Sequence, residues 1–444
     1  MSSTSAVPLT GLDALVHETA PVAPALLTMA SYSGTLAAAR CLGAHGVPVT
    51  VADPDLLAMA RWSRHATRRV FCPPVQRADR FLPWLLEFGR RFPGHVLYPT
   101  SDDTAWLYAL HAGELGGSFR LYQPPVEALY TLLNKRRLRQ ACTRAGIECP
   151  RTAFPQDASE VRKLGAEVGF PLIIKPQTQI LFWPHAKGAL ASSPEDLAAG
   201  YEGFVRRTAY ARAVLEYDPG VAHPMLQAYV PGAAEGIYNL SGFVDESGDL
   251  FAVRASRKVL QRPRRLGVGL CFQEASVDPS LAAKLHLLCR QVRYHGVFEA
   301  EFVEDRGRFL LIDFNPRYYG QMAFDIGRGL PLATLAHRGA LGQREGLRLL
   351  LEEAARVPLQ ARGEKVFCNG IELRMLLRIQ RLWGAMAPAE LARWRSWLQG
   401  SPDRRIDAIL DREDRGPAVA KVMSELLSLV RHPRSTLGHL ASGK

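Results

Sequence analysis

The sequence predicts a mixed α/β protein, and three regions of the chain carry this prediction. Residues 25–122 alternate short apolar runs with helix-like segments, which favours parallel strands joined by helices. Residues 299–317 contain two apolar, strand-like runs around a polar turn centred on Gly307. Beyond about residue 345 the composition becomes helical and basic. We therefore expect a parallel-sheet domain, a larger middle domain with hairpins, and a helical C-terminal extension.

The bulk composition is that of a globular protein with an excess of positive charge. The chain has 444 residues, enough for two or three compact units, with 47% hydrophobic and 22% charged residues. Its 55 Lys and Arg exceed its 43 Asp and Glu, giving a net charge of +12. No nucleic-acid recognition motif accompanies this charge, so a phosphate-rich small-molecule substrate explains it more simply than nucleic acid.

Cysteine usage and the chain ends predict a cytoplasmic protein. The seven cysteines are odd in number and form no Cys-x-x-Cys pair, which favours reduced thiols over disulfides or a zinc site. Residues 1–24 lack a charged segment followed by an apolar one and are expected to be a flexible leader. No stretch approaches the roughly 20 apolar residues of a membrane span.

Residues 25–122 are predicted to form the parallel-sheet domain. A short strand precedes the polar turn Ser31-Tyr32-Ser33-Gly34, a helix follows to about Gly46, and a second strand ends at Asp53. Residues 94–103 repeat the strand-to-polar-turn pattern before a helix from Thr104. Gly34 begins a turn of the phosphate-binding kind, but the chain lacks G-x-G-x-x-G here, so we favour a scaffold or substrate-side role for this domain.

The middle of the chain supplies a helix and several strands. Residues 128–150 predict one amphipathic helix closed by Gly146, and residues 170–176 predict a buried strand that carries Lys175. Residues 223–232 and a hairpin turning at Gly248 or Asp249 add further strands, and residues 261–270 are expected to be a basic loop.

Two amphipathic helices are predicted near the C-terminus, over residues 370–386 and 417–432. A segment rich in Trp and Arg, with Trp394 and Trp397, lies between them. Such stripes can bind a membrane surface or a partner, but packing on their own domain is the more common use, and we favour it.

The hairpin around Gly307 carries the strongest chemical signal. Folding about Gly307 sets Glu301 opposite Asp313 and Glu299 opposite Asn315. Because strand side chains alternate faces, these four polar side chains share one face, backed by apolar residues that include Phe302, Phe309, Leu311 and Phe314. Crowded hard oxygen donors favour Mg²⁺ over zinc, although a solvated acidic hairpin is the alternative.

Several cationic residues accompany this hairpin. Arg317 follows Asn315 in the same phase, where a positive charge can meet a phosphate or a developing anion. Lys175 lies inside an apolar strand and needs an anionic partner there, for which a phosphate is suited. The basic groups Arg254, Arg257 and Lys258, and then Arg262, Arg264 and Arg265, are either a clamp for a carboxylate or a solvated surface.

The chain contains, in this order, a helix lysine (Lys135), a strand lysine (Lys175), a linker strand, a basic loop and an acidic hairpin ending in Asn-Pro-Arg. This order of elements resembles the ATP-grasp superfamily. The resemblance covers residues 25–345 and is closest to its predicted carboxylate–amine ligases, which share elements like Trp62-Ser63-Arg64-His65 and Pro99-Thr100-Ser101-Asp102. It implies a pre-ATP-grasp domain (25–122), a two-lobed ATP-grasp domain (123–345) and a C-terminal extension (346–444). It also implies site roles: Lys135, Lys175 and Lys187 on ATP phosphates; Gln227, Ala228, Tyr229 and Val230 around adenine; Glu235 on ribose; Glu301, Asp313 and Asn315 on Mg²⁺; Arg317, Lys258 and Arg254 in catalysis.

Two features of this sequence differ from the usual pattern of the family. The second metal carboxylate is an aspartate, Asp313, where glutamate is usual, and the segment after Lys175 lacks the Gly-rich phosphate cover of many members. The function that the resemblance implies is ATP-dependent amide-bond formation between a small-molecule carboxylate and an amine, in an enzyme that is plausibly a dimer. The alternatives are a small-molecule kinase or carboxylase on the same scaffold, and a non-catalytic ATP-binding scaffold with a basic helical tail.

Overall fold

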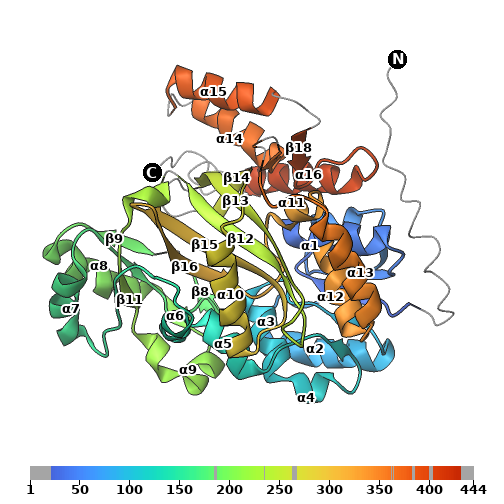
Figure 1. Ribbon diagram of the computed structural model, residues 1–444, viewed down its shortest axis with the longest axis horizontal. Helices are drawn as coiled ribbons and strands as arrows, with labels where there is room; N and C mark the ends of the chain where they lie inside the picture. The colour runs from blue at the N-terminus through green and yellow to red at the C-terminus, as the bar shows by residue number, and fades with distance from the viewer. Residues whose placement is uncertain are drawn as a thin grey trace.

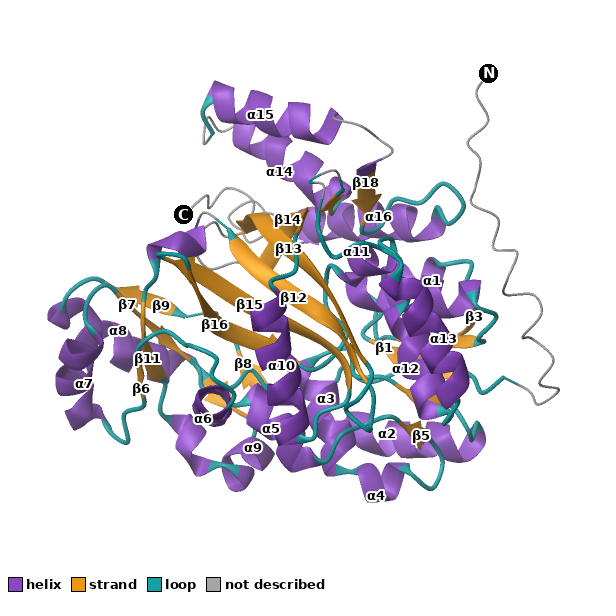
Figure 2. Cartoon of the chain, in the orientation of Figure 1, coloured by secondary structure: helices purple, strands orange, loops and turns teal. Residues whose placement is uncertain are grey.

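The computed structural model describes residues 22–184, 188–234, 236–262, 268–361, 363, 365–382, 386–399 and 404–431. These residues form four β-sheets, of five, two, four and seven strands, with helices against their faces (Figures 1 and 2). Most of the leader expected at residues 1–24 lies outside the described residues. The mixed α/β class predicted from the sequence is confirmed.

The N-terminal domain contains the predicted parallel sheet. Its elements are β1 (Ala25–Thr28), α1 (Ser33–Ala44), β2 (Val49–Ala52), the 3₁₀ helix η2 (Met59–Trp62), β3 (Ala66–Val70), α2 (Ala78–Arg91), β4 (Val96–Leu97), α3 (Asp102–Leu110), α4 (Ala112–Leu115) and β5 (Arg120–Leu121). The strand order is β3-β2-β1-β4-β5, and every pair is parallel. Ala25 and Leu27 pack in the same core cluster as α1, whereas Leu26 packs in the cluster that holds α2 and α3. Both faces of the sheet are therefore covered, as expected for parallel strands.

The helix expected over residues 128–150 is two helices instead, α5 (Val126–Leu133) and α6 (Lys135–Arg144). The break lies at Asn134, whose extended backbone (φ −96°, ψ 117°) cannot continue α5. Its side-chain oxygen accepts the backbone N–H groups of Arg136 and Arg137 and so caps α6. Lys135 thereby becomes the first residue of a new helix, and its N–H donates to the carbonyl of Gln177.

A small antiparallel sheet follows, in the order β6-β11-β7-β9. Its region contains β6 (Thr152–Ala153), η3 (Ala158–Glu160), α7 (Val161–Val168), β7 (Leu172–Lys175), β8 (Phe182–Trp183), β9 (Ala189–Ala191), α8 (Pro194–Arg207), β10 (Ala209–Tyr210), α9 (Arg212–Tyr217), η4 (Pro219–Ala222), β11 (Met225–Ala228) and η5 (Pro231–Ala234). Leu172 and Ile174 pack against α7 and α8. Ile173 and Lys175 alternate with them and line a cavity on the other face, as the period of a strand requires.

The large sheet has the order β16-β15-β12-β13-β14-β17-β18. This part of the chain contains β12 (Ile237–Val244), β13 (Phe251–Arg262), β14 (Val268–Ala275), α10 (Pro279–Val292), β15 (Gly296–Asp305), β16 (Arg308–Asn315), α11 (Met322–Ile326), α12 (Leu332–Ala340) and α13 (Arg344–Ala355). The predicted hairpin between β12 and β13 turns at Gly248, where φ is +75°. Residues 261, 262 and 268–270 of the expected basic loop belong to β13 and β14, and residues 263–267 lie outside the described residues.

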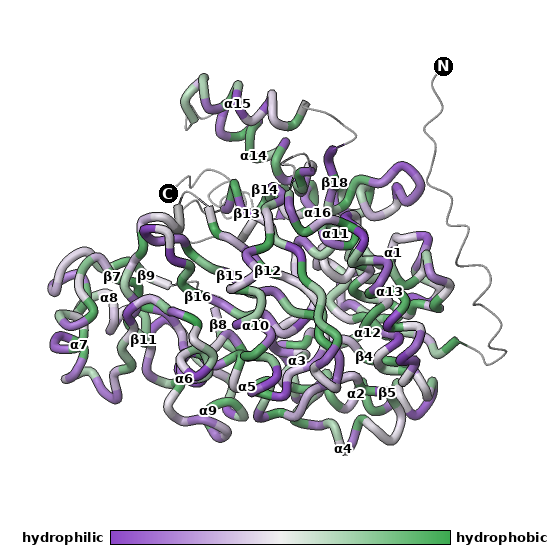
Figure 3. Tube along the Cα trace, in the orientation of Figure 1, coloured by the Kyte–Doolittle hydropathy of each residue, from purple (hydrophilic) through white to green (hydrophobic). Residues whose placement is uncertain are grey.

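The C-terminal region is not purely helical. Besides α14 (Gly370–Leu382), α15 (Pro388–Gln399) and α16 (Gly416–Arg431), it contributes the strands β17 (Val366–Cys368) and β18 (Arg405–Asp407) to the large sheet. Trp394 is 5% exposed in a cluster with Leu373 and Leu377, so the packing interpretation of this tryptophan is confirmed. On α16 several apolar side chains, Val430 among them, are exposed. Figure 3 shows how hydrophobic residues follow the inner strands while hydrophilic residues mark outer helices such as α7.

The C-terminal region also contacts the N-terminal domain, because α16 packs on η2. Asp414, 4% exposed, accepts hydrogen bonds from Ser63 Oγ (2.7 Å) and the backbone N–H of Arg64 (2.8 Å), and pairs with Arg40 Nε (2.9 Å). The Ser-Arg-His element singled out in the sequence therefore helps to hold the C-terminal region against the N-terminal domain.

All seven cysteines are free thiols in the described residues, in agreement with the composition. No helix within those residues has both the length and the apolar character needed to cross a bilayer.

Candidate active site

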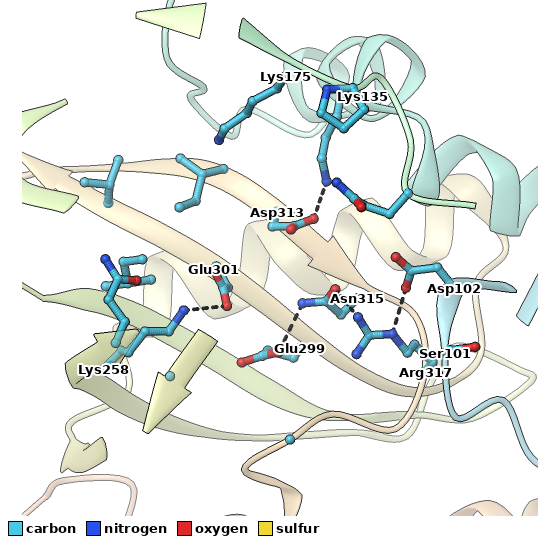
Figure 4. A pocket seen from close by; sticks show the side chains of 18 of the residues that line it. Ser101, Asp102, Lys135, Lys175, Lys258, Glu299, Glu301, Asp313, Asn315 and Arg317 are labelled. Carbon is cyan, nitrogen blue, oxygen red and sulfur yellow. Dashed lines mark hydrogen bonds and ion pairs between the residues drawn. The ribbon is translucent and has the colours of Figure 1, made fainter. Parts of the chain in front are cut away.

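A cavity of about 510 Å³ lies where the small sheet, the large sheet and the N-terminal domain meet. Its wall includes Lys175 from the small sheet, Asn315 from the large sheet and Asp102 from the N-terminal domain. Figure 4 shows Lys135 and Lys175 entering from one side, and Lys258 on the opposite side next to Glu301. The expectation that Lys175 and Asn315 share one cavity is met.

The acidic hairpin has the predicted register, reached by a route that the sequence did not indicate. The turn consists of Arg306 and Gly307, both with positive φ (50° and 77°), which is typical of the tightest hairpins. Continued regularly, this turn would place Glu301 opposite Ile312. A bulge follows Glu301 instead, so that Glu301 pairs with Asp313 and Glu299 with Asn315.

Alternation then separates the polar and apolar residues of the hairpin. Glu299, Glu301, Asp313 and Asn315 line the cavity. The apolar residues predicted behind them lie in the core with α10, where Phe302, Leu311 and Phe314 are buried and Phe309 packs against them. The predicted polar face is thus present, with the predicted apolar residues behind it; metal binding by this face stays a prediction.

Two lysines pair with the carboxylates of this face. Lys135 Nζ forms an ion pair with Asp313, and Lys258 Nζ lies 2.9 Å from Glu301 Oε1. Burial lowers the pKa of Lys258, but the charges of Glu301 and Glu299 outweigh it, so the pKa is raised above its ordinary value. Lys258 is therefore a permanent cation inside the cavity.

Glu299 is the most deeply buried carboxylate of the group, at 4% exposed. It accepts hydrogen bonds from Asn315 Nδ2 (3.1 Å) and from Gln321 Nε2. Burial, reinforced by the nearby charge of Glu301, raises the pKa of Glu299 to about 7. It is bound to amide groups rather than to one of the paired lysines, in contrast to Glu301.

Arg317 lies at the junction of the large sheet and the N-terminal domain. Its Nε donates to Asp102 Oδ1 (2.7 Å), its Nη2 to Asn315 Oδ1 (2.9 Å) and its Nη1 to the carbonyl of Tyr318 (3.1 Å). Although burial works against the charge, Asp102 leads the groups that raise the pKa of Arg317. The guanidinium is thus fully charged and held at three points.

The segment expected around adenine begins on β11. β11 is an inner strand between β6 and β7, and the N–H groups of Ala228 and Tyr229 already donate to the carbonyls of Arg151 and Pro171. Ala228 to Val230 still line the cavity, as does Gln227, whose Oε1 accepts a hydrogen bond from Lys175 Nζ (3.0 Å). These four residues remain candidates for an adenine site.

The structure does not bring Arg254 to the cavity. Its guanidinium is buried and donates to the carbonyls of Val253, Arg328 and Ala354. Arg254 lies on the same strand face as Lys258 but four residues away, which is about 13 Å along a strand. Arg257 pairs with Glu304 (2.8 Å). Lys187, Glu235, Arg264 and Arg265 lie outside the described residues.

The lining residues to which the sequence assigned no site role include Asp102, Gln321 and Tyr32. Asp102 belongs to the Pro-Thr-Ser-Asp element and Tyr32 to the turn after β1, so their polar turns were the available signal. Gln321 lies four residues beyond Arg317, in a segment without a periodic pattern. Gly34 also has a structural role, because a Cβ there would lie 2.5 Å from the carbonyl oxygen of Tyr319.

The donor set fits a magnesium ion shared with a phosphorylated ligand. Glu301, Asp313 and Asn315 offer two carboxylates and one amide oxygen on neighbouring strands. In the part of the chain that is described, no three His, Cys, Asp or Glu side chains are arranged to hold a metal by themselves. A cation here would therefore complete its coordination with oxygens of the ligand and water, which is the usual habit of Mg²⁺.

No protein-family model and no curated protein sequence matches the chain. Solved structures do match it. The biotin carboxylase domain of the Hydrogenobacter thermophilus 2-oxoglutarate carboxylase, solved with MgADP, ADP and bicarbonate, is 15% identical, with a TM-score of 0.58 over 73% of this chain and 70% of that chain. The Campylobacter jejuni biotin carboxylase is 16% identical (TM-score 0.57; 71% and 70%). The N5-carboxyaminoimidazole synthetase of Staphylococcus aureus is 14% identical (TM-score 0.54; 72% and 78%). At these identities the likeness shows a common fold.

Proposed function

We propose that this chain, whose fold is that of the ATP-grasp superfamily, is an ATP-dependent ligase that joins a carboxylate to an amine. The observation that carries the proposal is the single cavity in which Lys135 and Lys175 face Glu301, Asp313 and Asn315. A site that merely held a nucleotide would need the lysines, but not a metal-binding face with a fixed arginine beside it.

The reaction would proceed in two steps. An oxygen of the substrate carboxylate attacks the γ-phosphorus of ATP, the bond from phosphorus to the bridging oxygen breaks, and ADP leaves. The amine nitrogen then attacks the carbonyl carbon of the acyl phosphate, the carbon–oxygen bond breaks, and phosphate and a proton are released. Both steps bring together groups of like charge or poor reactivity, so positioning and charge neutralisation are the main tasks of the protein.

The described residues divide these tasks. Lys135 and Lys175, which line the cavity, would hold phosphate oxygens, and Arg317 would donate to the acyl phosphate. Glu301, Asp313 and Asn315 would hold magnesium. Bound there, magnesium would neutralise charge on the phosphate oxygens. Lys258 would hold the Glu301 carboxylate in place through their ion pair.

A release assay for ADP tests the proposal. Purified protein with ATP and Mg²⁺ is screened against a matrix of small carboxylates and amines, including the amino acids. We expect ADP formation to require one carboxylate and one amine together. ADP formation with a carboxylate alone and recovery of a phosphorylated product would indicate a kinase, and nucleotide binding with no ADP under any pair would indicate a scaffold.

A second candidate is carboxylation, in which bicarbonate takes the place of the carboxylate. The observation in its favour is that one structure with this fold was solved with bicarbonate and MgADP together. The chemistry is the same, since bicarbonate would form a mixed anhydride with phosphate before the amine attacks. Adding bicarbonate as a further row of the screen separates the two candidates.

A further inference from the structure

From the contacts around Arg317 we infer that Asp102 is a positioning residue, through which the N-terminal domain fixes the orientation of the arginine at the reacting end of the cavity. This inference deepens the proposed function and rests on it for the identity of the reaction. The juxtaposition that carries it is the ion pair between Asp102 of the N-terminal domain and Arg317, which lies 215 residues later in the chain.

The pair is shielded and directed into the cavity. The side chains of Arg317 and Asp102 are 15% and 16% exposed, and both line the cavity wall. In Figure 4 the two side chains point toward each other beside Asn315. At the surface such a pair would contribute little, but at this burial the geometry of the guanidinium is constrained.

The number of N–H donors on Arg317 shows how many remain available to a bound phosphate group. A guanidinium has five N–H bonds. Asp102, Asn315 and the carbonyl of Tyr318 take one each from Nε, Nη2 and Nη1. Tyr32 is a further hydrogen-bond partner of the guanidinium, so one N–H is left to meet an oxygen of a phosphate group. Without Asp102 the Nε–H is released, and the guanidinium stays held by uncharged partners alone, which constrain its plane less.

Asp102 itself is firmly placed. It is the first residue of α3, a helix capped by Ser101 and Thr104 and anchored by the fully buried Trp106. The positive end of the helix favours a carboxylate at this position. The same corner of the domain is tied to the segment after Arg317, because the N–H of Tyr318 donates to the carbonyl of Pro99 (3.0 Å).

The contact also joins Arg317 to the predicted metal face. Arg317 donates to Asn315 Oδ1, Asn315 Nδ2 donates to Glu299, and Gln321 donates to the other oxygen of Glu299. A carbonyl oxygen has two lone pairs, so Asn315 Oδ1 can accept from Arg317 and still bind a cation. A change at Asp102 is therefore expected to reach catalysis without touching the lysines on the nucleotide side.

The test compares Asp102→Ala and Asp102→Asn with wild type in the ADP-release assay. We expect Asp102→Ala to lower kcat by about 10- to 100-fold while KM for ATP changes by less than about threefold. Asp102→Asn, which keeps one oxygen acceptor, should fall between the two. Asp79→Ala is the matched control, because Asp79 lies in the same domain in an exposed pair with Arg77 and should leave kcat unchanged.

A double-mutant cycle separates positioning from a general structural role. In an Arg317→Ala background, Asp102→Ala should cause no further loss of kcat, because the group that it positions is gone. A further loss equal to that in the wild-type background, or an unchanged kcat in Asp102→Ala, would overturn the inference.

A second readout is independent of activity. In protein labelled with ¹⁵N-arginine, the Nε–H of Arg317, assigned with the Arg317→Lys variant, should exchange with solvent slowly in wild type and rapidly in Asp102→Ala. Equal exchange in both would refute the inference even if no substrate pair is known. Absence of ADP release from wild type together with slow exchange would count against the proposed function and leave the contact established.

Discussion

We predict that acid lowers the stability of the protein at the junction between the N-terminal domain and α12. His337 on α12 is 2% exposed and shares a hydrogen bond with the hydroxyl of Tyr98, which stacks on Tyr318 at 5.5 Å between ring centroids. Burial lowers the pKa of His337 from 6.5 to about 4. Unfolding exposes the imidazole and restores its ordinary pKa, so the unfolded chain takes up a proton at a higher pH than the folded protein.

The direction and the size of the pH effect on the free energy of unfolding follow from this difference in pKa. A lowered pKa in the folded state means that stability is fully present above pH 6.5 and is lost as the pH falls through the window from about 6.5 to 4. A shift of about 2.5 pKa units corresponds to about 3 kcal/mol in total. Between pH 7.5 and pH 5, the part lost is about 2 kcal/mol.

The assay is urea unfolding of wild type and His337→Asn at pH 7.5 and pH 5. Asparagine keeps a polar group near Tyr98 but does not titrate, so the variant should lose about 2 kcal/mol less than wild type over this interval. His111→Asn serves as the control, because His111 lies in a surface pair with Glu114. If His337→Asn and wild type lose the same free energy, the neutral buried imidazole is not the source of acid sensitivity.

Three further predictions concern the site and the core. Lys175→Ala and Asn315→Ala should each abolish ADP release with an unchanged circular dichroism spectrum, and wild-type rates in either variant would contradict their roles. Burial raises the pKa of Asp103 to about 6, so its contribution to stability is lost as the pH rises from about 4 to 6; Asp103→Asn should remove this decline and raise the melting temperature at pH 7. Trp394→Ala should cost about 3–5 kcal/mol of unfolding free energy, whereas the exposed Leu382→Ala should change it by less than about 0.5 kcal/mol; equal effects would contradict the packing of α15 on α14.

Most of the polar face of the site could be predicted because a strand has a simple period. Glu299 and Glu301 are two positions apart, as are Asp313 and Asn315, so a hairpin alone places all four on one face. The bulge that brings Glu301 to Asp313 could not be predicted, since the residues around Ile312 carry no local signal for an extra residue in that strand. The face was therefore predictable from the pattern, and the exact route to it was not.

Longer-range contacts explain the remaining differences. Arg254 shares a face with Lys258, but which carbonyls surround it depends on α13, far along the chain. The cap at Asn134 was a recognisable local signal in a sequence whose apolar stripe suggested a single helix. The partnership of Asp102 and Arg317 required knowing how two domains dock, which no periodicity encodes.

The contacts of Asp414 with Ser63, Arg64 and Arg40 have a consequence for folding during synthesis. Ser63 is 351 residues earlier in the chain, so its contact with Asp414 forms only after Asp414 has been synthesised. Until then the surface around η2 is not covered by α16, and Arg40 lacks its acidic partner Asp414. Contacts of such high sequence separation form slowly. Completion of the N-terminal domain therefore depends on the synthesis of α16, and a nascent chain stalled before α16 would be a target for chaperones or proteases.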